Sequence, residues 1–137
     1  MIEIEAQAPP DIAAGLSAAL LFACAELGVE RASLGLMLVG PEEMAQINLE
    51  HRDQPAATDV LSFPVDGPDL AEGWPEDGPA PELGDIIICP DAAVEPLETL
   101  AIHGLLHLLG YDHEADEGEM LALQDDLMDR YAARGDA

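Results

Sequence analysis

The sequence contains no lysine, and its few basic side chains are all arginines. Lys and Arg together number 4 among 137 residues, against 29 Asp and Glu, which gives a formal net charge of −25 at pH 7. A chain with this balance has no basic face that could follow the phosphates of a nucleic acid, and its charge opposes docking on an anionic membrane. The charge does not exclude an enzyme with one local positive centre.

Cysteines and long apolar runs are also scarce. The two cysteines, Cys24 and Cys89, lie far apart in apolar stretches, so we expect buried thiols in a reducing compartment. No apolar run approaches the roughly 20 residues that a membrane span requires. Residues 1–5 have neither the basic nor the apolar region of a signal peptide. These absences predict a cytoplasmic protein that makes no contact with a membrane.

The apolar residues, 49% of the chain, are arranged as in a folded domain. Alternating or continuous apolar runs predict strands at residues 2–7, 33–38, 59–63 and 84–89, the last of them buried on both faces. Helical spacing predicts helices from an N-cap at Asp11 to Gly28, from Pro41 onward, at 97–109 and at 115–134. Residues 51–58 and 64–81 are predicted as loops, the second of them mobile. We expect one α+β domain over residues 1–137, with a small mixed sheet packed against helices.

Three of the four histidines lie in one short segment, HGLLHLLGYDH. His103 and His107 are four positions apart, which places them on one face of a helix. Gly110 ends that helix, so the chain can turn and bring His113 back toward the other two. Three imidazoles with a fourth position open are the ligand set of a catalytic zinc site. The segment therefore predicts one Zn²⁺ per chain, since three histidines placed in this way by chance are improbable.

The same zincin-like spacing occurs in metzincin peptidases, whose motif is HExxHxxGxxH. In those enzymes the glutamate after the first histidine takes a proton from the water at the metal. Gly104 occupies that position here and cannot do so. A zinc metallopeptidase-like hydrolase is therefore an alternative that keeps the metal geometry and lacks the base.

HGLLHLLGYDH also resembles the signature of the YbeY family, the bacterial metal-dependent endoribonucleases of ribosomal RNA maturation. Two further blocks follow the family order: residues 48–64, which include NLEHR and TDVLSFP, and residues 83–86, LGDI. The resemblance implies a zinc-dependent, single-strand-specific endoribonuclease that processes the 3′ end of small-subunit ribosomal RNA and serves ribosome quality control. It also implies small-subunit ribosomal proteins and a ribosome-associated GTPase as partners. Residues 90–96 are shorter than the connection that most relatives carry.

The resemblance places the family's functional arginine at Arg52 and its zinc ligands at His103, His107 and His113. Arg52 is the only Lys or Arg between residues 31 and 130, and a guanidinium can grip two phosphate oxygens at once. We expect Arg52 to bind substrate and, with His107, to serve catalysis; the alternative for Arg52 is a surface salt bridge.

Ser62, Asp85 and Asp112 are further candidates, each with a structural alternative. The Ser62 hydroxyl could contact substrate or hold its strand in place. Asp85 could fix a loop near the metal or end its strand. Asp112 could orient a ligand histidine or cap the turn after Gly110, and we favour the cap. A third hypothesis for the whole chain is a non-catalytic ribosome assembly factor with zinc as a staple, although structural zinc sites normally have four protein ligands.

Overall fold

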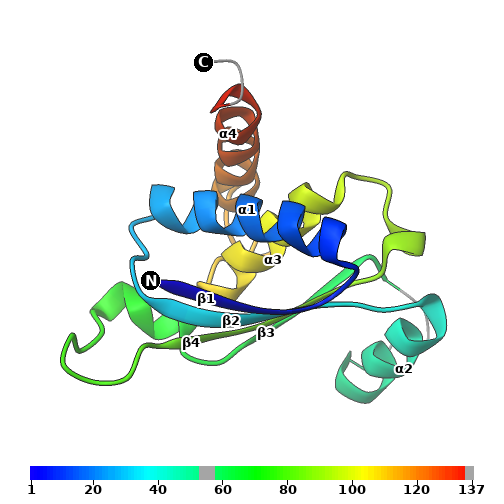
Figure 1. Cartoon of the computed structure of the whole chain (residues 1–137), viewed down its shortest axis with the longest axis horizontal. Coiled ribbons are helices and arrows are strands. Elements are labelled where there is room, and N and C mark those ends of the chain that lie inside the picture. Colours follow the sequence, from blue (N-terminus) through cyan, green and yellow to red (C-terminus); the bar gives the residue numbers. More distant parts are fainter. Residues whose placement is uncertain (53–57, 135–137) are drawn as a thin grey trace.

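One mixed four-stranded sheet, in the order β1-β2-β4-β3, organises the chain (Figure 1). The computed structural model describes residues 1–52 and 58–134, with Arg52 described by its backbone alone. The strands are β1 (Ile2–Gln7), β2 (Ala32–Leu38), β3 (Val60–Pro64) and β4 (Glu82–Ile88). The first, second and fourth run parallel, and β3 pairs with β4 in the antiparallel sense at the edge of the sheet. The four predicted strands are confirmed, β1 with the predicted bounds and the other three with ends shifted by one or two residues.

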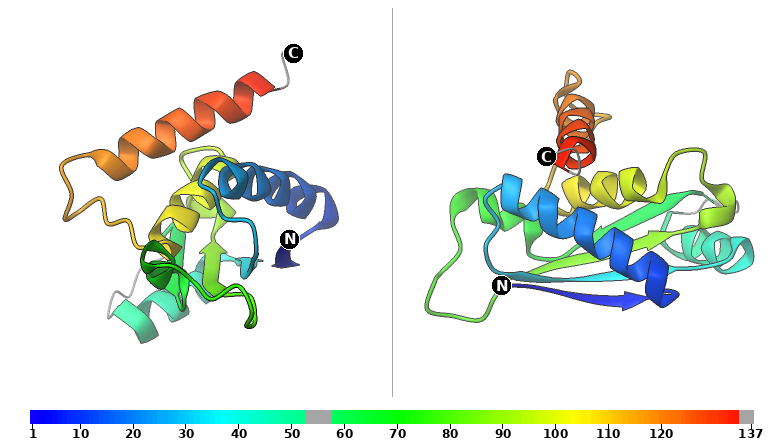
Figure 2. Two further views of the ribbon diagram at one scale, coloured as in Figure 1. Left: turned by 90° about the vertical axis from the view of Figure 1, so that its left-hand side faces the viewer. Right: turned by 45° about the horizontal axis from the view of Figure 1, so that its top comes forward.

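The helices cover the sheet unequally. Helices α1 (Pro10–Glu26) and α3 (Leu97–Leu108) lie on one face, and α4 (Glu119–Ala133) packs on the outer side of both, away from the sheet (Figures 1 and 2). Helix α2 (Pro41–Arg52) lies at one end of the sheet, where Met44 joins a small apolar cluster with Leu61 and Ile87. The result is the α+β domain expected from the sequence. No helix among the residues described is long and apolar enough to cross a membrane.

Strand β4 is the centre of the apolar core. Ile86 and Ile88 belong to the large cluster beneath α1 and α3, whereas Ile87 and Cys89 belong to the cluster beside α2. This division follows from the alternation of side chains along a strand. The prediction of a strand buried on both faces is therefore confirmed, with Asp85 as its exposed position. Both cysteines are free and buried, as expected.

The ends of three helices differ from the sequence prediction. Pro9 is the N-cap of α1, and Asp11 lies within the first turn, because Pro10 has the backbone angle of a first helical residue. Helix α2 continues through His51 to Arg52, where a loop was predicted. Helix α4 begins at Glu119 instead of residue 115, because the Asp116 carboxylate accepts the backbone N–H groups of Gly118 and Met120 and holds a turn.

Residues 64–81, which were predicted as a loop, contain regular structure. They include a 3-10 helix, η1 (Gly67–Glu72), whose first residue is buried against the backbone of Leu108 at the end of α3. The Arg31 guanidinium donates to the carbonyl of Gly78 at 2.8 Å and to that of Pro75 at 2.9 Å. These contacts link the glycine- and proline-rich segment to distant parts of the chain.

Candidate metal centre

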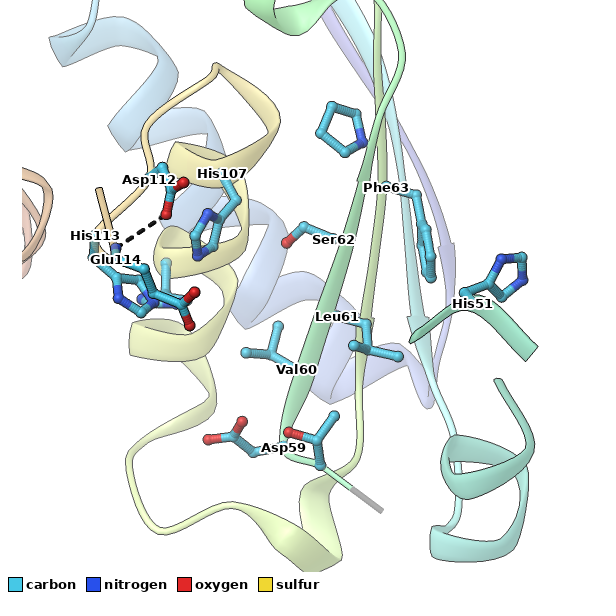
Figure 3. A pocket seen from close by; sticks show the side chains of 13 residues that line it. His51, Asp59, Val60, Leu61, Ser62, Phe63, His107, Asp112, His113 and Glu114 are labelled. Carbon is cyan, nitrogen blue, oxygen red and sulfur yellow. Dashed lines mark hydrogen bonds between the residues drawn. The ribbon is translucent and has the colours of Figure 1, made fainter. Parts of the chain in front are cut away.

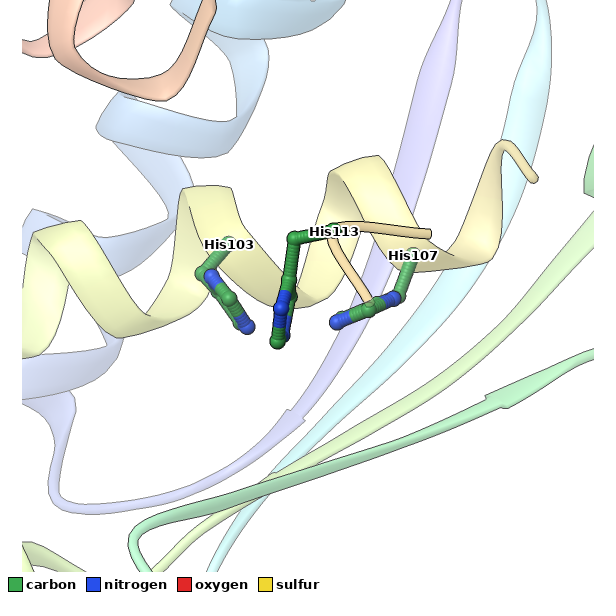
Figure 4. Close-up of side chains that lie close together, drawn as sticks. All are labelled: His103, His107 and His113. Carbon is green, nitrogen blue, oxygen red and sulfur yellow. The ribbon is translucent and has the colours of Figure 1, made fainter. Parts of the chain in front are cut away.

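The three histidines of the HGLLHLLGYDH segment converge on one point (Figure 4). His103 and His107 lie one turn apart on α3, and one ring nitrogen of each of the three lies within 4.8 Å of the others. The ring centroids are 4.7 Å apart for His103 and His107, and 5.2 and 5.1 Å from these two to His113. The predicted return of His113 is confirmed.

Gly110 makes this return possible. Its φ of +102° lies in the left-handed region, which L side chains rarely adopt. Gly110 N–H donates to the carbonyl of His107 at 3.0 Å, and Tyr111 N–H donates to that of Leu106 at 3.0 Å, so the last carbonyls of α3 are satisfied while the chain reverses. Gly110 therefore ends the helix and lets the chain reverse, so that His113 returns to the side of α3 that carries His103 and His107.

Hydrogen bonds to Nδ1 orient two of the imidazoles. His103 Nδ1 lies 2.6 Å from Oε1 of Gln124, a buried residue of α4, and His107 Nδ1 lies 3.0 Å from the carbonyl oxygen of Tyr111. Both partner atoms are oxygens, which only accept, so the tautomer that fits these contacts carries its proton on Nδ1 and keeps a free lone pair on Nε2. The donor set is thus three imidazoles, of which at least two present the nitrogen that a metal ion requires.

The environment of His107 favours the neutral form of its imidazole. Burial lowers the pKa of His107, and the neighbouring His103 and His113 lower it further, against the opposing effects of the Tyr111 carbonyl and Asp112. Because a metal binds only the neutral imidazole, the local electrostatics favour loading near neutral pH. The residues present therefore fit a divalent metal ion such as zinc.

A cleft of about 530 Å³ opens beside the histidines (Figure 3). Its two walls are the histidine segment, with Asp112 and Glu114, and the stretch from Thr58 through β3. Strand β3 is an edge strand, bonded to β4 on one side only, so one row of its backbone groups remains unpaired within the sheet. The cleft can therefore admit an extended chain alongside the metal position.

Ser62 and Asp112 lie at this cleft, and both make internal hydrogen bonds. The Ser62 hydroxyl donates to the carbonyl of Gly104 at 3.3 Å and joins β3 to α3. The Asp112 carboxylate accepts the backbone N–H of Glu114 at 3.0 Å, which is the turn cap favoured from the sequence.

Asp85 lies away from the histidines. Its exposed side chain lies beside Gly35 of β2, on the sheet face opposite α3, because Ile86 takes the face toward that helix. The expectation that Asp85 fixes a loop near the metal is therefore corrected. The side chain of Arg52 lies outside the part of the chain that the structure describes. Gln124 could not be predicted as a site residue from the sequence, because its partner His103 is 21 residues away on another helix.

Gly104, which follows the first histidine, lies against the sheet. A Cβ atom there would lie 2.7 Å from Cγ2 of Ile86 and 3.2 Å from the Ser62 hydroxyl oxygen. A glutamate of the peptidase motif has no room at this position unless α3 moves off the sheet or Ile86 changes its rotamer.

The fold and the site together define a small α+β protein with three histidines on a helix-turn that could hold a metal ion. The family model described as Endoribonuclease YbeY matches residues 3–132. The chain belongs to the YbeY family.

Individual relatives agree with this assignment. The chain is 42% identical over 118 residues to Endoribonuclease YbeY of Mycobacterium tuberculosis H37Rv and 40% identical to that of Mycobacterium sp. KMS. Each match covers 74% of this chain and 66% of the relative. The solution structure of TM1509 from Thermotoga maritima superposes with a TM-score of 0.55 at 28% identity, over 93% of this chain and 86% of that one.

Proposed function

We propose that this protein is a zinc-dependent, single-strand-specific endoribonuclease that processes the 3′ end of small-subunit ribosomal RNA in the cytoplasm and serves ribosome quality control. The observation that carries the proposal is the convergence of His103, His107 and His113 at the wall of an open cleft. The printed name of the family and of the mycobacterial relatives supplies the reaction class.

The three histidines would hold one Zn²⁺, which when bound supplies a Lewis acid for a phosphate oxygen. Three protein ligands leave a coordination position open, which favours a catalytic over a purely structural zinc. The cleft along β3 would orient the single strand, and Ser62 would keep that wall fixed to α3 through its bond to Gly104.

We propose Arg52 as the second charge at the scissile phosphate. Helix α2 ends at Arg52, and the preceding residue, His51, lines the cleft. The ring of His51 packs edge-on against that of Phe63 in β3, with the ring centroids 4.9 Å apart. A guanidinium can hold two oxygens of the phosphate in a planar fork, which a lysine cannot copy.

Cleavage of a single-stranded ribosomal RNA fragment tests this proposal. We expect the wild-type protein to lose its cleavage activity when a chelator is added. His107→Ala should be inactive both with and without the chelator. Arg52→Ala should be inactive with full zinc content and an unchanged circular dichroism spectrum, and Arg52→Lys should recover little. Arg130→Ala is the matched control, because Arg130 pairs with Glu26 and Asp126 at the surface of α4. Cleavage that survives both chelation and His107→Ala would refute zinc-dependent catalysis.

We further propose that protein partners deliver this enzyme to its RNA. In the described part of the cleft, the charged lining consists of Asp59, Asp112 and Glu114, with no Lys or Arg. Together with the net charge of −25, this lining repels a polyanion. Basic surfaces of small-subunit ribosomal proteins, or a ribosome-associated GTPase, would complement the acidic surface.

Binding measured over a salt series separates these two sources of affinity. We expect weak binding to a short single-stranded RNA with a shallow dependence on salt, and tighter binding to small ribosomal subunits. Tight binding to the naked RNA with a steep salt dependence would contradict delivery by partners.

A further inference from the structure

We propose that Gln124 is a positioning residue of the metal centre, which holds His103 in the tautomer that binds metal and thereby makes α4 part of the site. The inference rests on the metal centre of the proposed function but not on its RNA substrate. It starts from the 2.6 Å contact between Gln124 Oε1 and His103 Nδ1.

The position of Gln124 is one where an apolar residue would be expected. It lies between Met120 and Leu127 on the buried side of α4, and its own exposure is only 6%. A buried amide is unfavourable unless it is hydrogen-bonded. Because an apolar residue of similar size would suffice for packing, the hydrogen bond to His103 explains why a polar side chain is present at position 124.

The chemistry of the amide determines what this bond does. When Oε1 faces the ring, it accepts the Nδ1 proton, and Nε2 of His103 keeps the lone pair that a metal needs. When the amide is reversed, its NH₂ group donates to Nδ1, and Nε2 then carries a proton and cannot bind. With Oε1 toward the ring, as the structure has it, Gln124 therefore selects the tautomer that binds metal, and a carboxylate at this position, which only accepts, would select the same tautomer.

Of the two acceptors that bond to Nδ1 atoms of the histidines, only the one from Gln124 can be removed by a side-chain substitution. His107 has the backbone carbonyl of Tyr111 as its partner, which no side-chain substitution removes. Gln124→Met keeps length and buried volume but removes the acceptor, whereas Gln124→Glu leaves only acceptors. Gln46 of α2 supplies a control, because Gln46→Met makes the same change at an exposed residue that bonds to Glu50.

The test is zinc affinity, measured by competition with a chromophoric chelator, together with thermal unfolding of the zinc-free protein. We expect Gln124→Met to weaken zinc binding by about 10- to 100-fold, Gln124→Glu to bind at least as tightly as wild type, and Gln46→Met to bind as wild type does. Zinc-free Gln124→Met should unfold at a somewhat lower temperature than the wild type, because Nδ1 of His103 loses its acceptor. A merely structural role predicts this loss of stability with unchanged zinc affinity.

Nitrogen-15 NMR of the zinc-free imidazoles gives a second readout. We expect His103 to carry its proton on Nδ1 in the wild type and in Gln124→Glu, and to exchange between tautomers in Gln124→Met. Unchanged zinc affinity in Gln124→Met would overturn the role of Gln124 and leave the proposed function standing. A wild-type protein that binds no zinc would overturn the metal centre and this inference together.

Discussion

Replacing Gly104 by alanine should destabilise the protein, although alanine is the better helix former. The added Cβ would lie 2.7 Å from Cγ2 of Ile86, a contact that real Cβ atoms essentially never make, and 3.2 Å from Oγ of Ser62. Ile86 is fully buried in the central strand, so its methyl group cannot swing away into solvent. Helix α3 must therefore shift relative to the sheet, or Ile86 must leave its rotamer.

The size of the effect follows from two opposing contributions. Overpacking a filled core costs about 1–3 kcal/mol, and alanine in place of glycine inside a helix returns about 0.8–1.0 kcal/mol. We expect a net loss of up to about 2 kcal/mol for Gly104→Ala. Gly15→Ala in α1 is the matched control, because its Cβ would meet only Glu98 Oε1 at 3.9 Å, and it should be stabilising by up to about 1 kcal/mol.

Urea unfolding in the presence of a chelator measures these differences without a contribution from metal. A double-mutant cycle then identifies the cause: in an Ile86→Ala background the clash is gone, so the cost of Gly104→Ala should vanish, with a coupling of about 1–3 kcal/mol. If Gly104→Ala is as stabilising as Gly15→Ala, or costs the same in both backgrounds, the close approach of α3 to β4 is not what excludes a side chain at this position.

Three further predictions concern other parts of the chain. The zinc-free protein should lose stability as the pH falls below about 6.5, because the lowered pKa of His107 lets the unfolded state take up the proton first; urea unfolding at several pH values should show a smaller loss for His107→Gln. Arg31→Ala should hasten proteolysis within residues 73–81, as mass spectrometry of the fragments would show. Burial raises the pKa of Cys24 to about 11, so a thiol reagent at pH 8 should modify it only upon unfolding.

The parts of the site that sequence predicts are those that local geometry determines. The four-residue spacing of His103 and His107 specifies a shared helix face, and Gly110 specifies where the helix ends, so the convergence of three imidazoles follows from eleven consecutive residues. The strands were predictable for the same reason, since alternation and continuous apolar runs are local patterns.

The parts that were not predictable depend on contacts between distant residues. Alternation along β4 puts Asp85 and Ile87 on the same side, but only the packing of α3 on Ile86 shows which side faces the histidines. Gln124 lies in an apolar stripe of α4, and its meaning appears only when that helix docks beside His103. The contacts of Arg31 with a glycine- and proline-rich segment more than forty residues away are likewise visible only in the folded chain.

The order of strands in the sheet has a consequence for synthesis of the chain. Strand β3 precedes β4 in the sequence, yet its partner in the sheet is β4, which lies between it and β2. During translation, residues 60–64 therefore emerge from the ribosome before their partner strand exists. They can pair only after β4, which ends at residue 88, has also emerged. The segment between them is rich in acidic residues, glycine and proline, a composition that disfavours unwanted strand pairing in that interval. Strand β3, which forms one wall of the cleft, is thus synthesised before β4 but can join the sheet only after β4 has been made.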